Sequence, residues 1–578
     1  MKVIKPTNLG WMTLKNLAKI DDKYRENANL KRKKLAKLWS SEESMSDFLQ
    51  IFRHYADLAE SKIITTTDRE CKIKTVSETE IPIPLTIEKN LDEYVKLGLL
   101  EIEETSDSVF ETLRSINTEQ KNNPLQKLRS AYVELTGLCN LKCKHCYRGG
   151  SQPTEKGLDV ELLKKSLEPL LRAGITSISI TGGEATLRRE ALLEVVEYAS
   201  QHMALEGIPI KEKLLKKYGK ANPTIEDLLE TEQSQNLRKT LFNQLTKTKD
   251  EICAGDYAIW DKHTEEDVEK MLIHNATWRL KYDKEQSTYD LDSIGILTNG
   301  VFENPEELIA ELKKYGTGVH MQTSLDSFNG HTTNKHRGKK GVFGKVKRLV
   351  EIGKEEEFKI DITAHNIGGY NTRREKENER YFDQNAPMFV TDGFLQLGNS
   401  VENEGHENSK NTSKYQPEPK IGDLSSEKNS KKGWCTAWTA PEGIHIKPTG
   451  VIGNCLYVRG ISEFGNVTEQ SMEEILNGIQ NTRINEMFRD GTIEKYQHEL
   501  DKEIFNRKFS RACEIMVLTL TYGAIKERLI SEGCEDPIRE ANKETAKLCG
   551  YSVPEINYKK HTTNLETDSD SMLVAVAN

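Results

Sequence analysis

The chain has 578 residues, of which 30% are charged and 36% hydrophobic, and its 82 basic and 91 acidic side chains give a formal net charge of -9. Because binding to nucleic-acid phosphates requires a surplus of basic side chains, this balance argues against nucleic acid as a partner. The length predicts roughly three to four domains of about 150 residues each.

The amino-terminal segment lacks the uninterrupted apolar core of a secretory signal peptide, and no stretch approaches the ~20 apolar residues of a membrane span. We therefore expect a cytoplasmic protein with no membrane partner. Disulfides are rare in the cytosol, where clustered cysteines more often bind metal, and this chain has 10 cysteines.

Residues 1 to about 120 have the pattern of helices followed by short strands. Helical periodicity is present at 30–39 and 45–60, and the basic run at 31–37 is interpreted as a solvated helix face, with a binding patch as the alternative. The segment 81–104, "IPIPLTIEKNLDEYVKLGLLEIEE", suggests the strand, helix and wing of a small winged-helix domain that grips a leader peptide. A helical cap on the next domain is the alternative.

From residue 131 strands alternate with amphipathic helices such as 159–174, which has Gly174 as its expected C-cap. This alternation predicts an α/β fold with a parallel sheet, in which ligands gather at the carboxyl ends of the strands. A polar, mostly helical stretch at about 204–292 interrupts it and is expected to be an inserted lid or partner-binding element. The expected strands are 131–137, 177–184, 294–300, 319–328, 359–366 and 394–399.

Three cysteines directly follow the first of these strands. The segment "CNLKCKHCY" contains Cys139, Cys143 and Cys146, and three thiolates at this spacing can bind zinc, hold an iron–sulfur cluster or form a disulfide. A structural zinc site normally has four ligands in two pairs, and the local fourth candidate is His145. An iron–sulfur cubane held by three cysteines instead keeps one iron open for a substrate or cofactor. On spacing alone, zinc remains an alternative.

The second strand ends in "TGGEAT", at the same edge of the predicted sheet. Gly182 and Gly183 allow a ligand to approach the backbone closely, and the neighbouring Glu184 carboxylate can receive an ammonium group. The alternative is an ordinary strand-to-helix turn in which Glu184 complements the helix dipole. The cysteine segment one strand upstream favours the ligand-binding interpretation.

Together the two motifs resemble the radical S-adenosylmethionine (SAM) enzymes. "CNLKCKHCY" is similar to the CxxxCxxC loop of that family and "GGE" to its motif for the methionine amine of SAM, with Ala185 where many members have proline. The resemblance covers about 130–400 and implies a partial (β/α)6 barrel in which Cys139, Cys143 and Cys146 hold a [4Fe–4S] cluster. It also implies that the open iron binds SAM, which is cleaved reductively to methionine and a 5′-deoxyadenosyl radical that abstracts a substrate hydrogen.

The resemblance extends to polar residues at the ends of the third and fourth strands. Asn299, Ser324 and Asp326 stand at positions that contact the SAM ribose and carboxylate in the family. The segment "NKHRGKKGVFGKV" resembles the RG…F segment of the peptide-modifying branch, which implies that Arg337 faces the SAM carboxylate. An exposed loop cation is the alternative for Arg337.

A second group of cysteines, Cys435, Cys455 and Cys513, lies after the expected barrel. Fourteen residues separate Cys435 from Gly450 and four separate Gly450 from Cys455, which resembles the opening of the auxiliary-cluster domain called SPASM, or twitch in its shortened form. The dense run of later cysteines in the full SPASM pattern is reduced here to Cys513, so one auxiliary iron–sulfur cluster is expected. The alternative is that these cysteines are buried thiols that bind no metal.

The sequence thus predicts a radical SAM enzyme that acts on a peptide or protein, as in the maturation of ribosomally made peptides by crosslinking, epimerisation or oxidation. The expected partners are a precursor peptide and an electron donor such as flavodoxin or ferredoxin. The alternatives are a radical SAM dehydrogenase or oxidase acting on a small molecule and a zinc-stapled binding protein without catalysis. The expected regions are an N-terminal module at 1–125, a radical SAM core at 126–400, a linker at 401–433, a SPASM/twitch-like domain at 434–555 and a disordered tail at 556–578.

Overall fold

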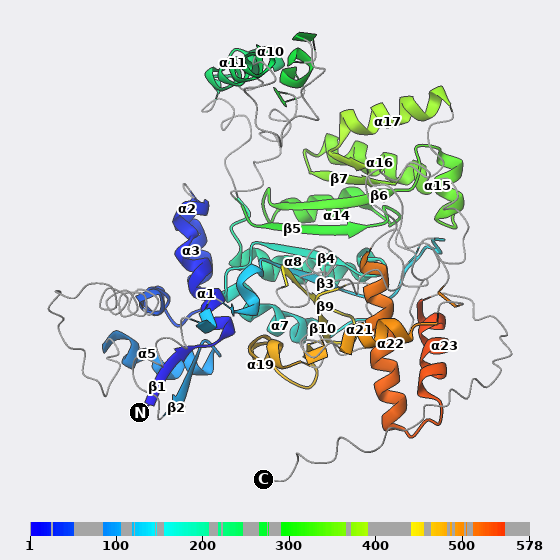
Figure 1. Cartoon of the computed structure of the whole chain (residues 1–578). Helices are drawn as coiled ribbons and strands as arrows, with labels where there is room; N and C mark the ends of the chain where they lie inside the picture. Colours follow the sequence, from blue (N-terminus) through cyan, green and yellow to red (C-terminus); the bar gives the residue numbers. More distant parts are fainter. Residues whose placement is uncertain are drawn as a thin grey trace.

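Figure 1 shows the computed structural model of the chain, in which one sheet runs through the centre. The residues that the structure describes are 2–24, 27–50, 85–105, 118–120, 122–144, 146, 155–206, 218–220, 224–246, 265–266, 268–273, 275–276, 291–365, 372–390, 441–455, 464–482, 486–487, 492–501, 504–505 and 512–549.

In this part of the chain the central sheet has nine strands, in the order β11-β10-β9-β3-β4-β5-β6-β7-β8. The strands from β3 to β8 are all parallel, and the sheet stays open, which confirms the predicted α/β class with a partial barrel. The expected strand at 394–399 lies outside the described residues. The bounds are β3 Ser130–Glu134, β4 Ser177–Thr181, β5 Ser293–Thr298, β6 Val319–Leu325, β7 Ile360–Ala364 and β8 Met388–Val390.

Helices cover the outside of these strands and bury their apolar faces against them. In α7 (Val160–Arg172), Asp159 caps the amino end by accepting hydrogen bonds from two backbone N–H groups, and leucines at helical spacing are buried. Gly174 follows with a φ of 75°, which confirms it as the residue that ends this helix. The other covering helices are α8 Arg189–His202, α14 Pro305–Lys313 and α16 Val342–Glu355, and α15 Gly330–His336 and α17 Arg373–Asn385 pack against α16.

The amino-terminal residues pack at the end of the sheet where the strands begin. Strands β1 (Lys2–Pro6) and β2 (Leu100–Glu104) form an antiparallel ribbon, and α1 (Asn8–Ala18) joins the hydrophobic core of the sheet. The basic run lies on α3 (Ala28–Ala36), where the expectation of a solvated face is wrong for Lys31. The remaining elements here are α2 Ile20–Tyr24, α5 Leu85–Lys96 and the 3-10 helix η3 Pro124–Lys127.

Lys31 is only 1% exposed. Its buried charge is compensated because Nζ lies 2.5 Å from Oδ2 of Asp292, which is itself completely buried. Asp292 directly precedes β5 and also accepts a hydrogen bond from the Tyr24 hydroxyl. This buried ion pair fastens α3 to the beginning of the fifth strand. Residues 51–84, which contain part of the predicted winged helix, lie outside the described residues.

The chain from residue 443 extends the same sheet instead of starting another. Strand β9 (Gly443–Ile446) pairs in parallel with β3, and β10 (Val451–Gly453) and β11 (Gly465–Asn466) follow as antiparallel neighbours. The carboxy-terminal helices come next, and α22 packs against α23. Their bounds are α19 Met472–Gly478, η10 Ile479–Asn481, α21 Thr492–Glu499, α22 Ala512–Ser531 and α23 Pro537–Cys549.

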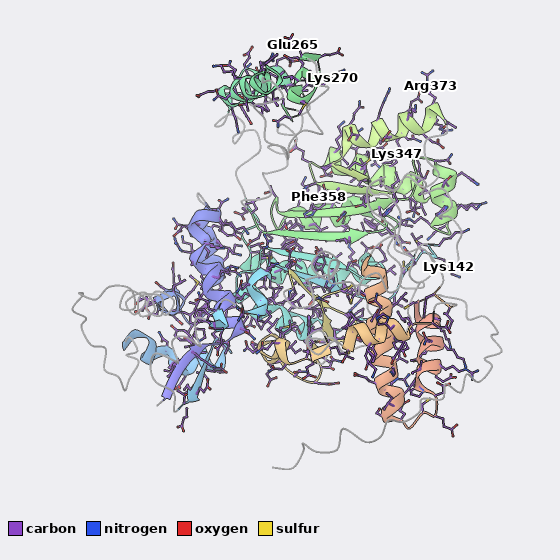
Figure 2. All side chains as sticks on the ribbon, viewed as in Figure 1. Lys142, Glu265, Lys270, Lys347, Phe358 and Arg373 are labelled. Atoms are coloured by element: carbon purple, nitrogen blue, oxygen red, sulfur yellow. The ribbon has the colours of Figure 1, made fainter. Side chains whose placement is uncertain are left out.

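The expected insertion contains α10 (Ile225–Leu229) and α11 (Glu232–Thr246), which lie apart from the sheet in Figure 1. Together with the segment that carries Glu265 and Lys270 in Figure 2, they surround a small apolar cluster of their own. None of the helices in the described residues is both long and apolar enough to span a bilayer.

Candidate functional site

The three cysteines of the first motif lie in the loop after β3, at the carboxyl edge of the sheet. Cys139, Cys143 and Cys146 are half-buried, and no disulfide joins them. The backbone N–H of Lys144 donates to the carbonyl of His336 at 2.8 Å, which ties the loop to the segment before Arg337. In Figure 2, Lys142 of this loop lies at the arrowhead end of the strands, whereas Phe358, just before β7, lies at the opposite end.

The three thiols are close enough to affect one another electrostatically. Burial raises the pKa of Cys139 and raises that of Cys143 to about 12, and the neighbouring cysteines add to both increases. Within the described residues, no group of three His, Cys, Asp or Glu side chains is placed to hold a single metal ion. A cubane does not require such convergence, because each of its cysteines binds a different iron atom.

The two glycines of "GGE" allow another group to lie very close to their Cα atoms. In this structure that group is the backbone of residues 136–138 of the same chain. A Cβ atom on Gly183 would lie 2.1 Å from the carbonyl oxygen of Leu138, and one on Gly182 would lie 2.3 Å from that of Thr136. The backbone N–H of Gly183 also donates to the Thr136 carbonyl at 2.7 Å. The two glycines therefore allow the segment that leads into the cysteine loop to pack directly against the end of β4.

Replacement of Gly183 by alanine should lower the free energy of unfolding by about 2–3 kcal/mol, because the added Cβ collides with fixed backbone. Gly344 in α16 is the matched control, since nothing lies within 4 Å of a Cβ at that position. Gly344→Ala should leave stability unchanged or raise it by up to ~1 kcal/mol. Chemical denaturation of both variants measures the difference; equal stability of the two would contradict the role given to Gly183.

Glu184 is 1% exposed and has both carboxylate oxygens occupied. Its Oε1 accepts from the Thr186 backbone N–H (3.2 Å), the Thr186 hydroxyl (2.6 Å) and the Thr298 hydroxyl (2.9 Å), and its Oε2 accepts from the Asn299 N–H at 2.8 Å. Burial raises the pKa of Glu184 above its usual value, while these donors oppose the rise. Oε1 thus accepts three hydrogen bonds and Oε2 accepts one, so an ammonium group can bind Glu184 at the second acceptor position of Oε2 or by replacing a donor on Oε1.

Asn299 connects Glu184 to the cysteine loop. Its backbone N–H donates to Oε2 of Glu184, and its side-chain Nδ2 donates to Oδ1 of Asn140 at 2.8 Å and to Sγ of Cys139 at 3.8 Å. Asn140 in turn donates to the carbonyl of Val301. The end of β5 is thus hydrogen-bonded both to the carboxylate that follows β4 and to the first cysteine.

Arg337 forms the corresponding connection at the end of β6. Its Nε lies 2.9 Å from Oδ2 of Asp326 and its Nη2 2.5 Å from Oδ1, a two-point ion pair, and Nη2 also donates to the Ser324 hydroxyl at 2.9 Å. Burial opposes the charge on Arg337, but Asp326 and Cys143, to which Arg337 also hydrogen-bonds, raise its pKa above the usual value. Arg337 is therefore a buried cation, not an exposed one.

The structure thus brings one set of predicted residues together at a single edge of the sheet: Cys139, Cys143, Cys146, Gly182, Gly183, Glu184, Asn299, Ser324, Asp326 and Arg337. Cys455 is not among them. It follows β10, whose Gly453 pairs with His445, so it lies toward the end where β9 and β3 begin. Cys435 and the side chain of Cys513 lie outside the described residues.

Sequence reasoning missed Thr186 and Asn140, and it grouped Thr298 with the strand-end residues expected to contact SAM, whereas its hydroxyl donates to Glu184. Thr186 stands two residues after Glu184 and donates to it through both its backbone and its hydroxyl, a local turn that the spacing of the two residues could have indicated. Asn140 lies between the first two cysteines, where no sequence pattern distinguishes it from a solvated loop residue.

The Radical SAM superfamily model matches residues 133–230, which contain the cysteine loop and "GGE". This part of the chain is a radical SAM domain. The family implies a [4Fe–4S] cluster and SAM as cofactors, and the donor set fits: three thiols that are not in disulfides, one beside the Asn299 amide and one beside the Arg337 guanidinium.

The chain also has curated relatives. It is 34% identical over 74 residues to a probable GTP 3′,8-cyclase of Methanopyrus kandleri (13% of this chain and 24% of that protein). It is 27% identical over 124 residues to the antilisterial bacteriocin subtilosin biosynthesis protein AlbA of Bacillus subtilis (22% and 28%). The chain spans about a quarter of the length of these relatives.

Among solved structures, Streptococcus suis SuiB bound to the precursor peptide SuiA aligns with a TM-score of 0.35 and 11% identity, over 77% of this chain and 80% of that one.

Proposed function

We propose that the chain is a radical SAM enzyme that abstracts a hydrogen from a peptide or protein substrate. The observation that carries this proposal is the convergence of three thiols with the Glu184–Asn299 and Asp326–Arg337 networks at one edge of the sheet. In an open α/β fold, this edge is where ligands bind.

In this proposal Cys139, Cys143 and Cys146 hold the [4Fe–4S] cluster. When bound, the cluster supplies one electron to SAM, whose cleavage gives methionine and a 5′-deoxyadenosyl radical able to take a substrate hydrogen. Asn299 and Arg337 each donate a hydrogen bond to a cluster cysteine, which fixes the ligand's orientation and favours its thiolate form. The electron donor is proposed to be a small redox protein such as flavodoxin or ferredoxin.

Glu184 and Arg337 are proposed to bind the amino and carboxylate groups of SAM, respectively. Both side chains already form hydrogen bonds within the chain, so SAM would use the positions that these bonds leave open or replace one of the existing partners. For Glu184 an ammonium group can replace the Thr186 or Thr298 hydroxyl, because each of these hydroxyls can rotate to another acceptor. For Arg337 the fork is held by Asp326, and the remaining donors of the guanidinium are available for a carboxylate.

The peptide class of substrate rests on the relative named for biosynthesis of the bacteriocin subtilosin, because bacteriocins are peptides or proteins. A small-molecule substrate is the second candidate, supported by the match to GTP 3′,8-cyclase. The two matches cover 13% and 22% of the chain, so neither one decides the substrate.

The two candidates are distinguished by incubating the reconstituted enzyme, without oxygen, with SAM, dithionite and either a precursor peptide encoded beside its gene or GTP. The proposal expects a mass change in the peptide, measured by mass spectrometry, together with a rise in 5′-deoxyadenosine formation of at least about tenfold over the substrate-free rate. Product formation from GTP with an unmodified peptide would contradict the peptide class and establish the second candidate.

We further propose that Cys435, Cys455 and Cys513 hold one auxiliary iron–sulfur cluster in a SPASM/twitch-like domain at 434–555. Cys435 precedes β9 and Cys455 follows β10, and since β9 and β10 are an antiparallel pair, the chain enters and leaves this hairpin at the same end. This topology supports the proposal that both cysteines are ligands of the same cluster.

A further inference from the structure

A pocket of about 700 Å³ lies at the end of the sheet opposite the cysteine loop. Its floor is formed where the strands begin, by residues such as Ser177 of β4, Ser293 of β5 and His320 near the start of β6. Its walls come from η3 and from α1, α2 and α3, and Figure 1 shows the last three at the ends of the strands away from the arrowheads. The volume is within the range of about 300–1,000 Å³ that small-molecule sites occupy.

The lining of this pocket is strongly basic, although the chain as a whole carries a net charge of -9. Among the described residues it includes no aspartate or glutamate, and the hydroxyls of Thr176, Ser177 and Ser293 add polar donors. The cationic side chains that line it are Lys15, Lys19, Lys23, Lys31, Lys127, Arg129 and Lys359.

Two of these charges are balanced by acidic side chains. Lys31 forms an ion pair with Asp292, and Nζ of Lys359 lies 3.4 Å from Oδ2 of Asp361. By contrast, Lys15, Lys19, Lys127 and Arg129 form no ion pair with an acidic side chain in the described part of the chain. The positive charge on this side of the pocket is therefore uncompensated, and a concave surface concentrates its field.

Lys15 shows the effect of this uncompensated charge. It is half-buried, and burial followed by the charges of Lys19 and Arg129 lowers its pKa below the usual value. An anion between these three side chains would relieve both the repulsion and the missing solvation. The Lys15 ammonium donates to the backbone carbonyl of Gln126, a neutral acceptor that leaves the positive charge unbalanced, so the arrangement of these cations points to a bound anion.

We propose that this pocket binds the phosphate chain of a small polyphosphate, either inorganic or carried by a nucleotide. Several separate cations facing a common space suit a ligand whose negative charges are spread along its length, and lysine is an established phosphate binder. A concave pocket of this volume suits a small molecule better than the face of a protein. This site is separate from the cysteine loop, so its test does not depend on the proposed function.

The proposal is tested by calorimetric titration of the full-length protein with tripolyphosphate and with ATP, in the presence of saturating SAM and without divalent ions. We expect saturable binding of one equivalent. In the triple variant Lys19→Glu, Lys127→Glu, Arg129→Glu, the affinity should fall at least about tenfold, which corresponds to 1.4 kcal/mol. The matched control is Lys33→Glu, Lys37→Glu, which reverses two exposed charges of the same region outside the pocket, and should change affinity less than about twofold.

Equal affinity for the two probes would show that the phosphate chain is recognised by itself, and tighter binding of ATP would show that the nucleoside contributes; both support the site. If neither probe showed saturable binding, the proposal would be overturned. It would also be overturned if the triple variant and the control lost affinity to the same extent. Because the substituted side chains are exposed, the unliganded triple variant should unfold at a temperature equal to or above that of the wild type.

Discussion

Replacing any one of Cys139, Cys143 and Cys146 by alanine is expected to remove the cluster iron and reduce the rate of SAM cleavage by more than about 100-fold. Even the outer partners of metal ligands contribute 10–100-fold to metal affinity or activity, so loss of a ligand itself has a larger effect. The measurement is iron and sulfide content after anaerobic reconstitution, with the visible absorbance of the cluster.

Cys534→Ala is the matched control, because Cys534 is a half-buried thiol after α22, in a different part of the structure. It should retain the iron content and activity of the wild type. Iron that remains in a variant lacking all three loop cysteines would report the proposed auxiliary cluster. If the single alanine variants kept full iron and activity, the assignment of the loop as the cluster site would be contradicted.

The second large effect is expected at the buried ion pair that supports Cys143. Arg337→Met should lower the free energy of unfolding by about 3–5 kcal/mol, because it leaves the fully buried carboxylate of Asp326 without its cation. Combining it with Asp326→Asn should restore part of this stability, since the uncompensated charge is then removed as well.

Arg373→Met provides the control, because the side chain of Arg373 is 92% exposed and its ion pair to Glu377 is a surface contact within one helix. Figure 2 labels Arg373 on α17, at the outside of the molecule. Its replacement should change stability little. Denaturant titration measures all three variants. If Arg337→Met and Arg373→Met had equal stability, Arg337 would not have the structural role given to it here.

The sequence alone predicted the parallel sheet and the edge at which the motifs meet. Strand periodicity placed β3, β4, β5 and β6, and because parallel strands end at a common edge, the cysteine loop, Glu184, Asn299 and Asp326 had to lie near one another. These features follow from local pattern and topology, which is why they could be predicted.

The contacts within the site could not be predicted in the same way. The hydrogen-bond donors to Glu184 come partly from Thr298 and Asn299, more than a hundred residues away. Likewise, Lys31 was interpreted as solvated because its own segment is basic, whereas its partner Asp292 is 261 residues distant. The parallel pairing of β9 with β3 also joins distant segments. In each case the decisive partner is supplied by tertiary structure.

The most direct test of the proposed radical SAM activity is the formation of 5′-deoxyadenosine from SAM by the reconstituted wild type under a strong reductant, without oxygen. We expect 5′-deoxyadenosine and methionine in equal amounts, with no product when the reductant is omitted or when all three loop cysteines are alanine. A wild-type protein that takes up only zinc and leaves SAM intact would contradict it, and the loop would then be a metal staple in a binding protein.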